Sequence, residues 1–129
     1  MMFNPPKRTM LVVDDDRAIL KVFSRIFEKN GYSVATAETG REAAEKLETH
    51  NYDAALLDLR LPDMSGADLL PRMREISPKM VKIIITGMPE DNSDEVERSG
   101  ADAFLSKPVE PEFLLNVLDI KLREKKPKP

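Results

Sequence analysis

Short, nearly continuous apolar segments alternate along this chain with longer segments in which apolar residues recur at helical spacing. A short apolar run bounded by polar residues is typical of a strand that is buried on both faces of a parallel sheet. The short runs therefore predict five strands, at residues 10–13, 33–37, 54–57, 81–85 and 103–105.

The longer segments predict the helices. Pro71 lies inside one of their apolar stripes and predicts a short or kinked helix there. A fourth helix is expected within residues 89–99, where Val96 is almost the only apolar residue, so that helix should be short or frayed. Alternating strands and helices of this kind predict an α/β fold, a doubly wound parallel sheet with helices on both faces. The apolar stripes that predict the other four helices lie in residues 19–27, 43–47, 69–76 and 113–122.

Only the two ends of the chain lack these patterns. Residues 1–8 contain Pro5 and Pro6, and residues 124–129 mix charged residues with proline. We therefore expect one domain at residues 9–123, an N-terminal tail at 1–8, and at 124–129 either a C-terminal tail or the start of a linker. The length of 129 residues is that of one ordinary domain.

The amino-acid composition excludes or argues against several classes of function. The chain has no cysteine, which excludes disulfides, zinc fingers and thiol catalysis, and its single histidine, His50, argues against a Ser-His-Asp triad. A net charge of −3 argues against direct binding to nucleic acid. No apolar run approaches the length of a membrane span, and the first residues do not resemble a secretory signal, so we expect a cytoplasmic protein that does not contact a membrane.

Charged and hydroxyl side chains follow four of the predicted strands directly. Asp14, Asp15 and Asp16 follow the first strand, Asp58 the third, Thr86 the fourth, and Lys107 comes shortly after the fifth. The carboxyl ends of parallel strands lie at one edge of a sheet, where open α/β sheets bind their ligands. The sequence therefore predicts that these groups share one crevice.

Clustered carboxylates at such an edge repel one another unless a cation lies between them. Asp14, Asp15 and Asp58 offer hard oxygen ligands, which suit Mg²⁺ better than zinc. With the metal and Lys107 beside it, Asp58 can attack phosphorus and carry the phosphoryl group as an acyl phosphate. Thr86 can donate a hydrogen bond to a phosphoryl oxygen.

Four motifs at their observed spacing resemble the CheY-like receiver domain of two-component response regulators, over roughly residues 9–123. The resemblance implies a flavodoxin-like fold, with a five-stranded parallel sheet in the order 2-1-3-4-5 and five flanking helices. The motifs are LVVDDD at 11–16, LLDLRLPDMSG at 56–66, IIITG at 83–87 and FLSKP at 104–108.

The resemblance also implies roles for individual residues. Asp58 would accept the phosphoryl group from a histidine kinase, a phosphotransfer protein or a small phosphodonor, and Lys107 would bind the phosphate. Asp14, Asp15, Asp58 and the backbone carbonyl of Arg60 would bind Mg²⁺. The Lys107–Pro108 peptide bond is commonly cis in this family.

The resemblance further implies a conformational switch. Thr86 and Phe104 match the switch pair of the family, which re-packs the surface of the fourth helix, fifth strand and fifth helix when the aspartate is phosphorylated. That surface would control an output domain or target protein, or would form a homodimer. A domain of this kind catalyses its own phosphorylation and dephosphorylation and acts on no external substrate.

Two other functions remain open at this point. One is a Mg²⁺-dependent phosphohydrolase, although such enzymes usually carry an acid or base two residues after the nucleophilic aspartate, where this chain has Arg60. The other is a pseudo-receiver that keeps the fold as an interaction domain without being phosphorylated. Each residue also has a structural interpretation: the aspartates as helix caps, Thr86 as an ordinary strand end, and Lys107 as a surface lysine.

Overall fold

A computed structural model describes residues 7–87 and 100–125 of the chain. Within them lies a five-stranded sheet in the order β2-β1-β3-β4-β5, and all neighbouring strands are parallel. This is the strand order that the resemblance implies. The strands are β1 (Arg8–Val13), β2 (Tyr32–Ala37), β3 (Ala54–Asp58), β4 (Val81–Thr86) and β5 (Ala103–Ser106).

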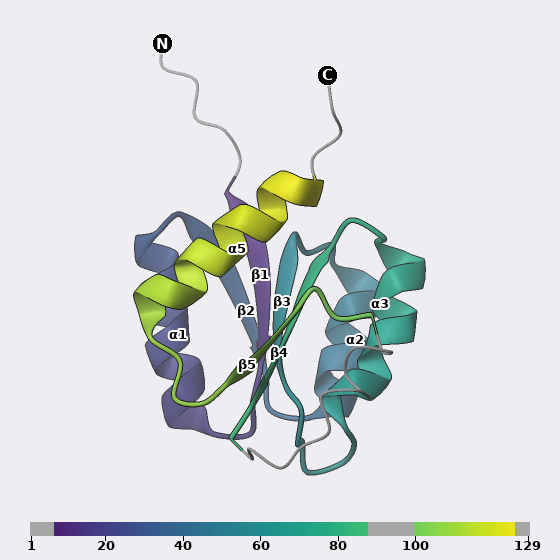
Figure 1. The fold of residues 1–129 in the computed structure, drawn as a ribbon. Coiled ribbons are helices and arrows are strands. Elements are labelled where there is room, and N and C mark those ends of the chain that lie inside the picture. Colours follow the sequence, from purple (N-terminus) through teal and green to yellow (C-terminus); the bar gives the residue numbers. More distant parts are fainter. Residues whose placement is uncertain (1–6, 88–99, 126–129) are drawn as a thin grey trace.

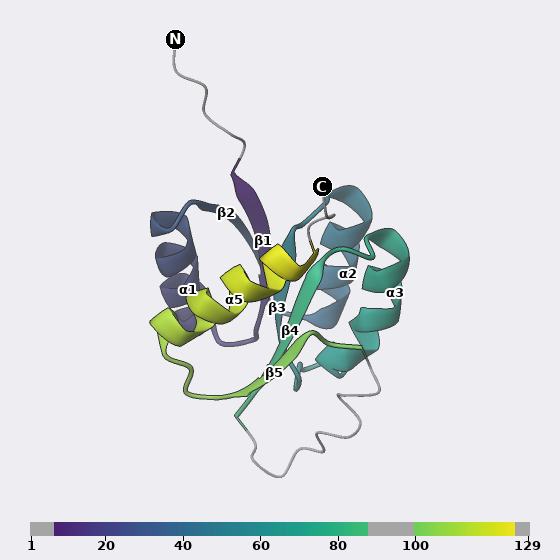
Figure 2. The same cartoon turned by 45° about the horizontal axis from the view of Figure 1, so that its top comes forward.

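Helices cover both faces of the sheet (Figures 1 and 2). Helices α1 (Arg17–Lys29) and α5 (Pro111–Lys125) lie on one face, and α2 (Gly40–Thr49) and α3 (Leu70–Ile76) lie on the other. The described residues therefore contain four α-helices rather than the five expected. The expected fourth helix, within 89–99, lies outside the described residues.

Local sequence explains where the helices begin. The side chain of Asp16 accepts a hydrogen bond from the backbone N–H of Ala18 at 2.9 Å and so caps α1. Pro71 lies in the first turn of α3, where the missing N–H of proline breaks no helical hydrogen bond. Helix α3 has only 7 residues, which confirms the predicted short helix. A 3₁₀ turn, η1 (Gly66–Leu69), directly precedes it.

The two faces of the sheet support separate apolar cores. Leu11 and Val13 of β1 pack with the side chains of α2 and α3, whereas Met10 and Val12 pack with those of α1 and α5. Strands β3 and β4 are buried over their whole lengths, as expected for strands that are covered on both faces. None of the helices among the described residues is long and apolar enough to cross a membrane.

This topology places the functional residues. Because all five strands run in the same direction, the ends of β1, β3 and β4 meet at one edge of the sheet, the lower edge in Figure 1. Helix α5 ends at the opposite edge, where β1 begins. The predicted polar residues therefore come together at one pole of the domain.

Candidate functional site

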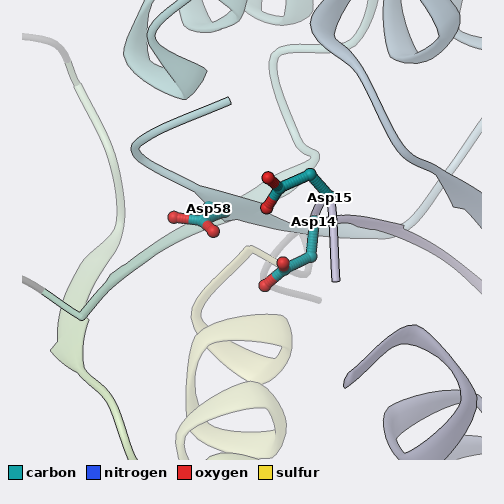
Figure 3. A group of neighbouring side chains, drawn as sticks. All are labelled: Asp14, Asp15 and Asp58. Carbon is teal, nitrogen blue, oxygen red and sulfur yellow. The ribbon is translucent and has the colours of Figure 1, made fainter. Parts of the chain in front are cut away.

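Asp14 and Asp15 leave the end of β1 toward the strand end that carries Asp58 (Figure 3). Asp14 is only 5% exposed, and its Oδ1 accepts a hydrogen bond from the backbone N–H of Asp16 at 2.9 Å. Asp15 is exposed to solvent. Asp16 is engaged as the cap of α1, so the structural interpretation holds for this aspartate.

Asp58 is the last residue of β3 and is 7% exposed. Its Oδ1 accepts a hydrogen bond from the backbone N–H of Arg60 at 3.1 Å, which brings the backbone of Arg60 to the edge of the cluster. Asp14, Asp15 and Asp58 each offer one carboxylate oxygen, and these oxygens all lie within 4.8 Å of one another. Oxygen atoms at such separations can share one divalent cation.

Lys107 joins the two buried carboxylates. Its Nζ lies 2.9 Å from Oδ2 of Asp14 and 3.0 Å from Oδ2 of Asp58. The backbone N–H of Lys107 donates to the carbonyl of Thr86 at 2.7 Å, so the lysine is held against the end of β4. The Lys107–Pro108 peptide bond is cis, as the resemblance implies.

Burial and charge shift the protonation equilibria of this pair. Burial raises the pKa of Asp58, and the charge of Asp14 raises it further, while the hydrogen bonds from Lys107 and Arg60 act in the opposite direction. Burial lowers the pKa of Lys107, but its hydrogen bonds to Asp14 and Asp58 outweigh that effect and raise it. Three carboxylates with one ammonium leave an excess of negative charge, which a divalent cation would balance.

The two predicted switch residues occupy different places. Thr86, the last residue of β4, is 1% exposed and lies at the same sheet edge as the acidic cluster. Phe104 lies within β5, beside Ile84 in the register, and packs half-buried against the core on the side of α2 and α3. Gly87 leaves room at the edge, since among the described residues a Cβ added there would come near Cδ of Lys107 alone, at 3.6 Å.

Sequence reasoning did not identify Asp63, which lies in the loop after β3. Its two carboxylate oxygens accept hydrogen bonds from the backbone N–H groups of Gly40 and Arg41, at 2.8 Å and 2.9 Å. An aspartate beside a proline in a loop is an ordinary turn residue by sequence alone. Its partners lie 23 and 22 residues away, so no local signal could have found this contact.

Comparisons with known proteins agree with this arrangement. The family model described as the response regulator receiver domain matches residues 10–119. The alginate biosynthesis transcriptional regulatory protein AlgB of Pseudomonas putida is 39% identical over 106 residues, which are 81% of this chain and 24% of that protein. The chain thus spans about a quarter of the length of this curated relative.

Two solved structures have the same fold. One is the CheY-like response regulator receiver domain protein of Methanospirillum hungatei JF-1, which is 41% identical with a TM-score of 0.87, over 92% of this chain and 96% of that one. The other is the NtrC4 receiver domain, solved in solution as a beryllofluoride-activated dimer. It is 34% identical with a TM-score of 0.84, over 92% of this chain and 98% of that one.

Proposed function

Because this chain belongs to the response regulator receiver domain family, we propose that it accepts a phosphoryl group on Asp58 in a Mg²⁺-dependent reaction and thereby switches an output. One observation carries the assignment of the residue. The Nζ of Lys107 lies within 3.0 Å of carboxylate oxygens of both Asp14 and Asp58, at the edge where Asp15 adds a third carboxylate. An ordinary surface lysine would not connect two buried acids.

The proposed reaction transfers one phosphoryl group. A carboxylate oxygen of Asp58 forms a bond to phosphorus while the bond between phosphorus and the donor atom breaks, and the donor leaves with that electron pair. The product is an acyl phosphate. Lys107 holds positive charge beside the oxygens on which negative charge develops, and Thr86 supplies a hydroxyl at the same edge.

The residues present fit a hard divalent cation. Asp14, Asp15 and Asp58 supply oxygen ligands, and the Arg60 backbone is held at the cluster by its hydrogen bond to Asp58. Bound Mg²⁺ would neutralise the carboxylates and stabilise charge on the phosphoryl oxygens. The cluster contains neither histidine nor cysteine, which is consistent with Mg²⁺ rather than zinc.

The proposal includes partners on both sides of the switch. A histidine kinase or phosphotransfer protein would supply the phosphoryl group, in the cytoplasm as the sequence leads us to expect. Thr86 and Phe104 would pass the change at Asp58 to β5, because Thr86 lies at the site and Phe104 lies on the neighbouring strand. The chain would act on no external substrate, and no observation favours the phosphohydrolase or the pseudo-receiver.

The same proposal extends to a homodimer through the surface of the fourth helix, β5 and α5. Phe113 and Ile120, seven residues apart on α5, are 54% and 49% exposed and place two large apolar side chains in solvent along this helix. The similar NtrC4 receiver domain is a dimer when activated with beryllofluoride. Light scattering with and without Mg²⁺ and beryllofluoride tests this part, and a mass that stays monomeric at high concentration in both conditions contradicts it.

Intact-protein mass spectrometry tests the function. After incubation with acetyl phosphate and Mg²⁺, the chain should gain the mass of one phosphoryl group, and Asp58→Asn should gain none. Asp68→Asn, which changes an exposed aspartate outside the cluster, is the matched control and should be modified like the wild type. An unmodified wild-type chain at saturating donor contradicts the proposal.

A further inference from the structure

The loop that follows Asp58 turns back on itself within a few residues. The backbone N–H of Leu61 donates to the carbonyl of Met64 at 3.1 Å, and the N–H of Gly66 donates to the carbonyl of Leu59 at 2.8 Å. Between these bonds, Arg60 pairs with Ser65 in an isolated antiparallel bridge. The loop, residues 59–65, is therefore a narrow turn with Arg60 at its base and Asp63 near its tip.

The tip of this loop is fastened to helix α2. Asp63 accepts the backbone N–H groups of Gly40 and Arg41, which begin α2 and have no partner within the helix. The side-chain hydroxyl of Thr39, the residue before the helix, accepts the next N–H, that of Glu42, at 3.0 Å. The first turn of α2 is thus capped jointly by its own N-cap residue and by a residue of the phosphoacceptor loop.

Packing supports the same contact. A Cβ added to Gly40 would lie 2.3 Å from both Cγ and Sδ of Met64, so the Met64 side chain packs in the space that a larger residue at position 40 would need. Met64 also packs against the core beneath α2 and α3. The backbone N–H groups of Gly40 and Arg41 lower the pKa of Asp63, which keeps the side chain ionised as a charge-assisted acceptor.

We propose that Asp63 is a positioning residue of the metal site, which fastens the 59–65 loop to the first turn of α2 and thereby holds the Arg60 carbonyl where a metal ion can bind it. The inference rests on the function proposed above. Partners that orient a metal ligand commonly contribute to affinity although they do not touch the metal. Asp63 lies on the same short turn as Arg60, and its two hydrogen bonds join that turn to the first residues of α2.

The competing explanation is that Asp63 only stabilises α2. Thr39 provides a matched control, because Thr39→Ala also removes a hydrogen bond from the first turn of α2 but does not touch the loop. If helix capping is the whole role, Asp63→Ala and Thr39→Ala lower the free energy of unfolding and leave Mg²⁺ affinity unchanged. If Asp63 positions Arg60, only Asp63→Ala weakens Mg²⁺ binding.

Calorimetric titration with Mg²⁺ of the wild type, Asp63→Ala, Asp63→Asn and Thr39→Ala tests the proposal, with circular dichroism to verify folding. We expect the Kd of Asp63→Ala for Mg²⁺ to rise about tenfold. The Kd of Thr39→Ala should stay within about twofold of the wild-type value. Asp63→Asn, which keeps one acceptor oxygen, should lie between them.

Two outcomes separate this inference from the function on which it rests. If Asp63→Ala binds Mg²⁺ as tightly as the wild type, only the positioning role is overturned. The same holds if Thr39→Ala weakens Mg²⁺ binding as much as Asp63→Ala does. A wild-type chain that binds no Mg²⁺ overturns the proposed function and the positioning role together. Amide hydrogen exchange on the metal-free chains adds a second readout, because Asp63→Ala should speed exchange at Gly40 and Gly66, whereas Thr39→Ala should leave Gly66 protected.

Discussion

Gly66 lies directly against the backbone of Asp58. A Cβ added to Gly66 would come within 2.2 Å of the Asp58 carbonyl oxygen, which is a backbone atom that cannot move aside cheaply. We predict that Gly66→Ala lowers the free energy of unfolding by about 1–3 kcal/mol, the usual cost of forcing extra volume into a packed site. Urea denaturation measures the change.

Gly87→Ala is the control for this prediction. Within residues 7–87 and 100–125, a Cβ at Gly87 would meet the flexible side chain of Lys107 and nothing else, at an ordinary contact distance of 3.6 Å. Its free energy of unfolding should stay within about 0.5 kcal/mol of the wild type. Equal stability of Gly66→Ala and Gly87→Ala would show that the loop does not return as closely to Asp58 as the structure has it.

Lys107→Met should slow phosphorylation without preventing Mg²⁺ binding. The variant removes the only ammonium within hydrogen-bonding distance of both Asp14 and Asp58 among the described residues, and with it a charge that stabilises the phosphoryl oxygens. Loss of one such stabilising group commonly costs about a hundredfold in rate. The rate of mass gain with acetyl phosphate measures this, and calorimetry measures the Kd for Mg²⁺, which should be unchanged or lower.

Lys107→Arg provides the graded comparison. Arginine keeps the charge but presents a broad planar group in place of a compact ammonium, so an intermediate rate is expected. A Lys107→Met chain that is phosphorylated at the wild-type rate would make Lys107 an ordinary buried ion-pair partner.

Replacing Asp58 by asparagine should stabilise the metal-free protein at neutral pH. Burial raises the pKa of Asp58 in the folded state, so the folded chain binds this proton more tightly than the unfolded chain. Stability from this group is therefore lost as the pH rises from the unfolded value of about 3.9 through the raised folded value. Asp58→Asn lacks this loss, so its advantage in urea denaturation should be largest at pH 7 and should shrink toward about pH 4.

Magnesium should reverse the order of stability. A ligand present at a hundred times its Kd stabilises the folded state by about 2.7 kcal/mol, and the wild type should gain more from Mg²⁺ than Asp58→Asn, which has lost one carboxylate of the cluster. An equal gain for both chains would remove Asp58 from the metal site.

We predict a second pH effect on stability from Lys82, which lies outside the acidic cluster. This lysine of β4 is 2% exposed, and its Nζ donates to the carbonyl of Met80 at 3.0 Å. Burial lowers its pKa, and the charges of Lys125 and Arg74 lower it further, against the effect of Asp102. The unfolded state therefore binds this proton more tightly, and stability rises as the pH rises through the folded value toward about 10.4.

Between neutral pH and about pH 10, the free energy of unfolding of the wild type should therefore increase relative to that of Lys82→Met. Lys21→Met, which changes an exposed lysine of α1, is the control. A difference between wild type and Lys82→Met that stays constant with pH would contradict the effect of burial.

Much of this architecture follows from the order of apolar and polar residues. Strands β3 and β4 were predictable because both their faces are buried, so nearly every residue is apolar. Each also includes one residue beyond the predicted end, Asp58 and Thr86, because the backbone ladder continues there: the N–H of Leu59 donates to Ile85 at 2.8 Å. The acidic cluster was predictable for the same reason, since parallel strands bring their ends together.

The remaining features depend on tertiary contacts that a linear pattern does not contain. The contact of Asp63 with Gly40 joins a loop to the start of a helix that lies 23 residues earlier in the chain, and only the folded sheet brings them together. Lys82 interrupts an apolar run, and the pattern does not show that its ammonium finds the Met80 carbonyl.

Chemical mapping of the phosphorylated residue tests the central claim most directly. Borohydride reduces an aspartyl phosphate to homoserine, so peptide mass spectrometry after treatment with acetyl phosphate, Mg²⁺ and borohydride identifies the residue that carried the phosphoryl group. The account predicts homoserine at position 58 alone, and none when Mg²⁺ is removed by a chelator. Homoserine at position 14 or 15, or modification of equal extent without Mg²⁺, would contradict it.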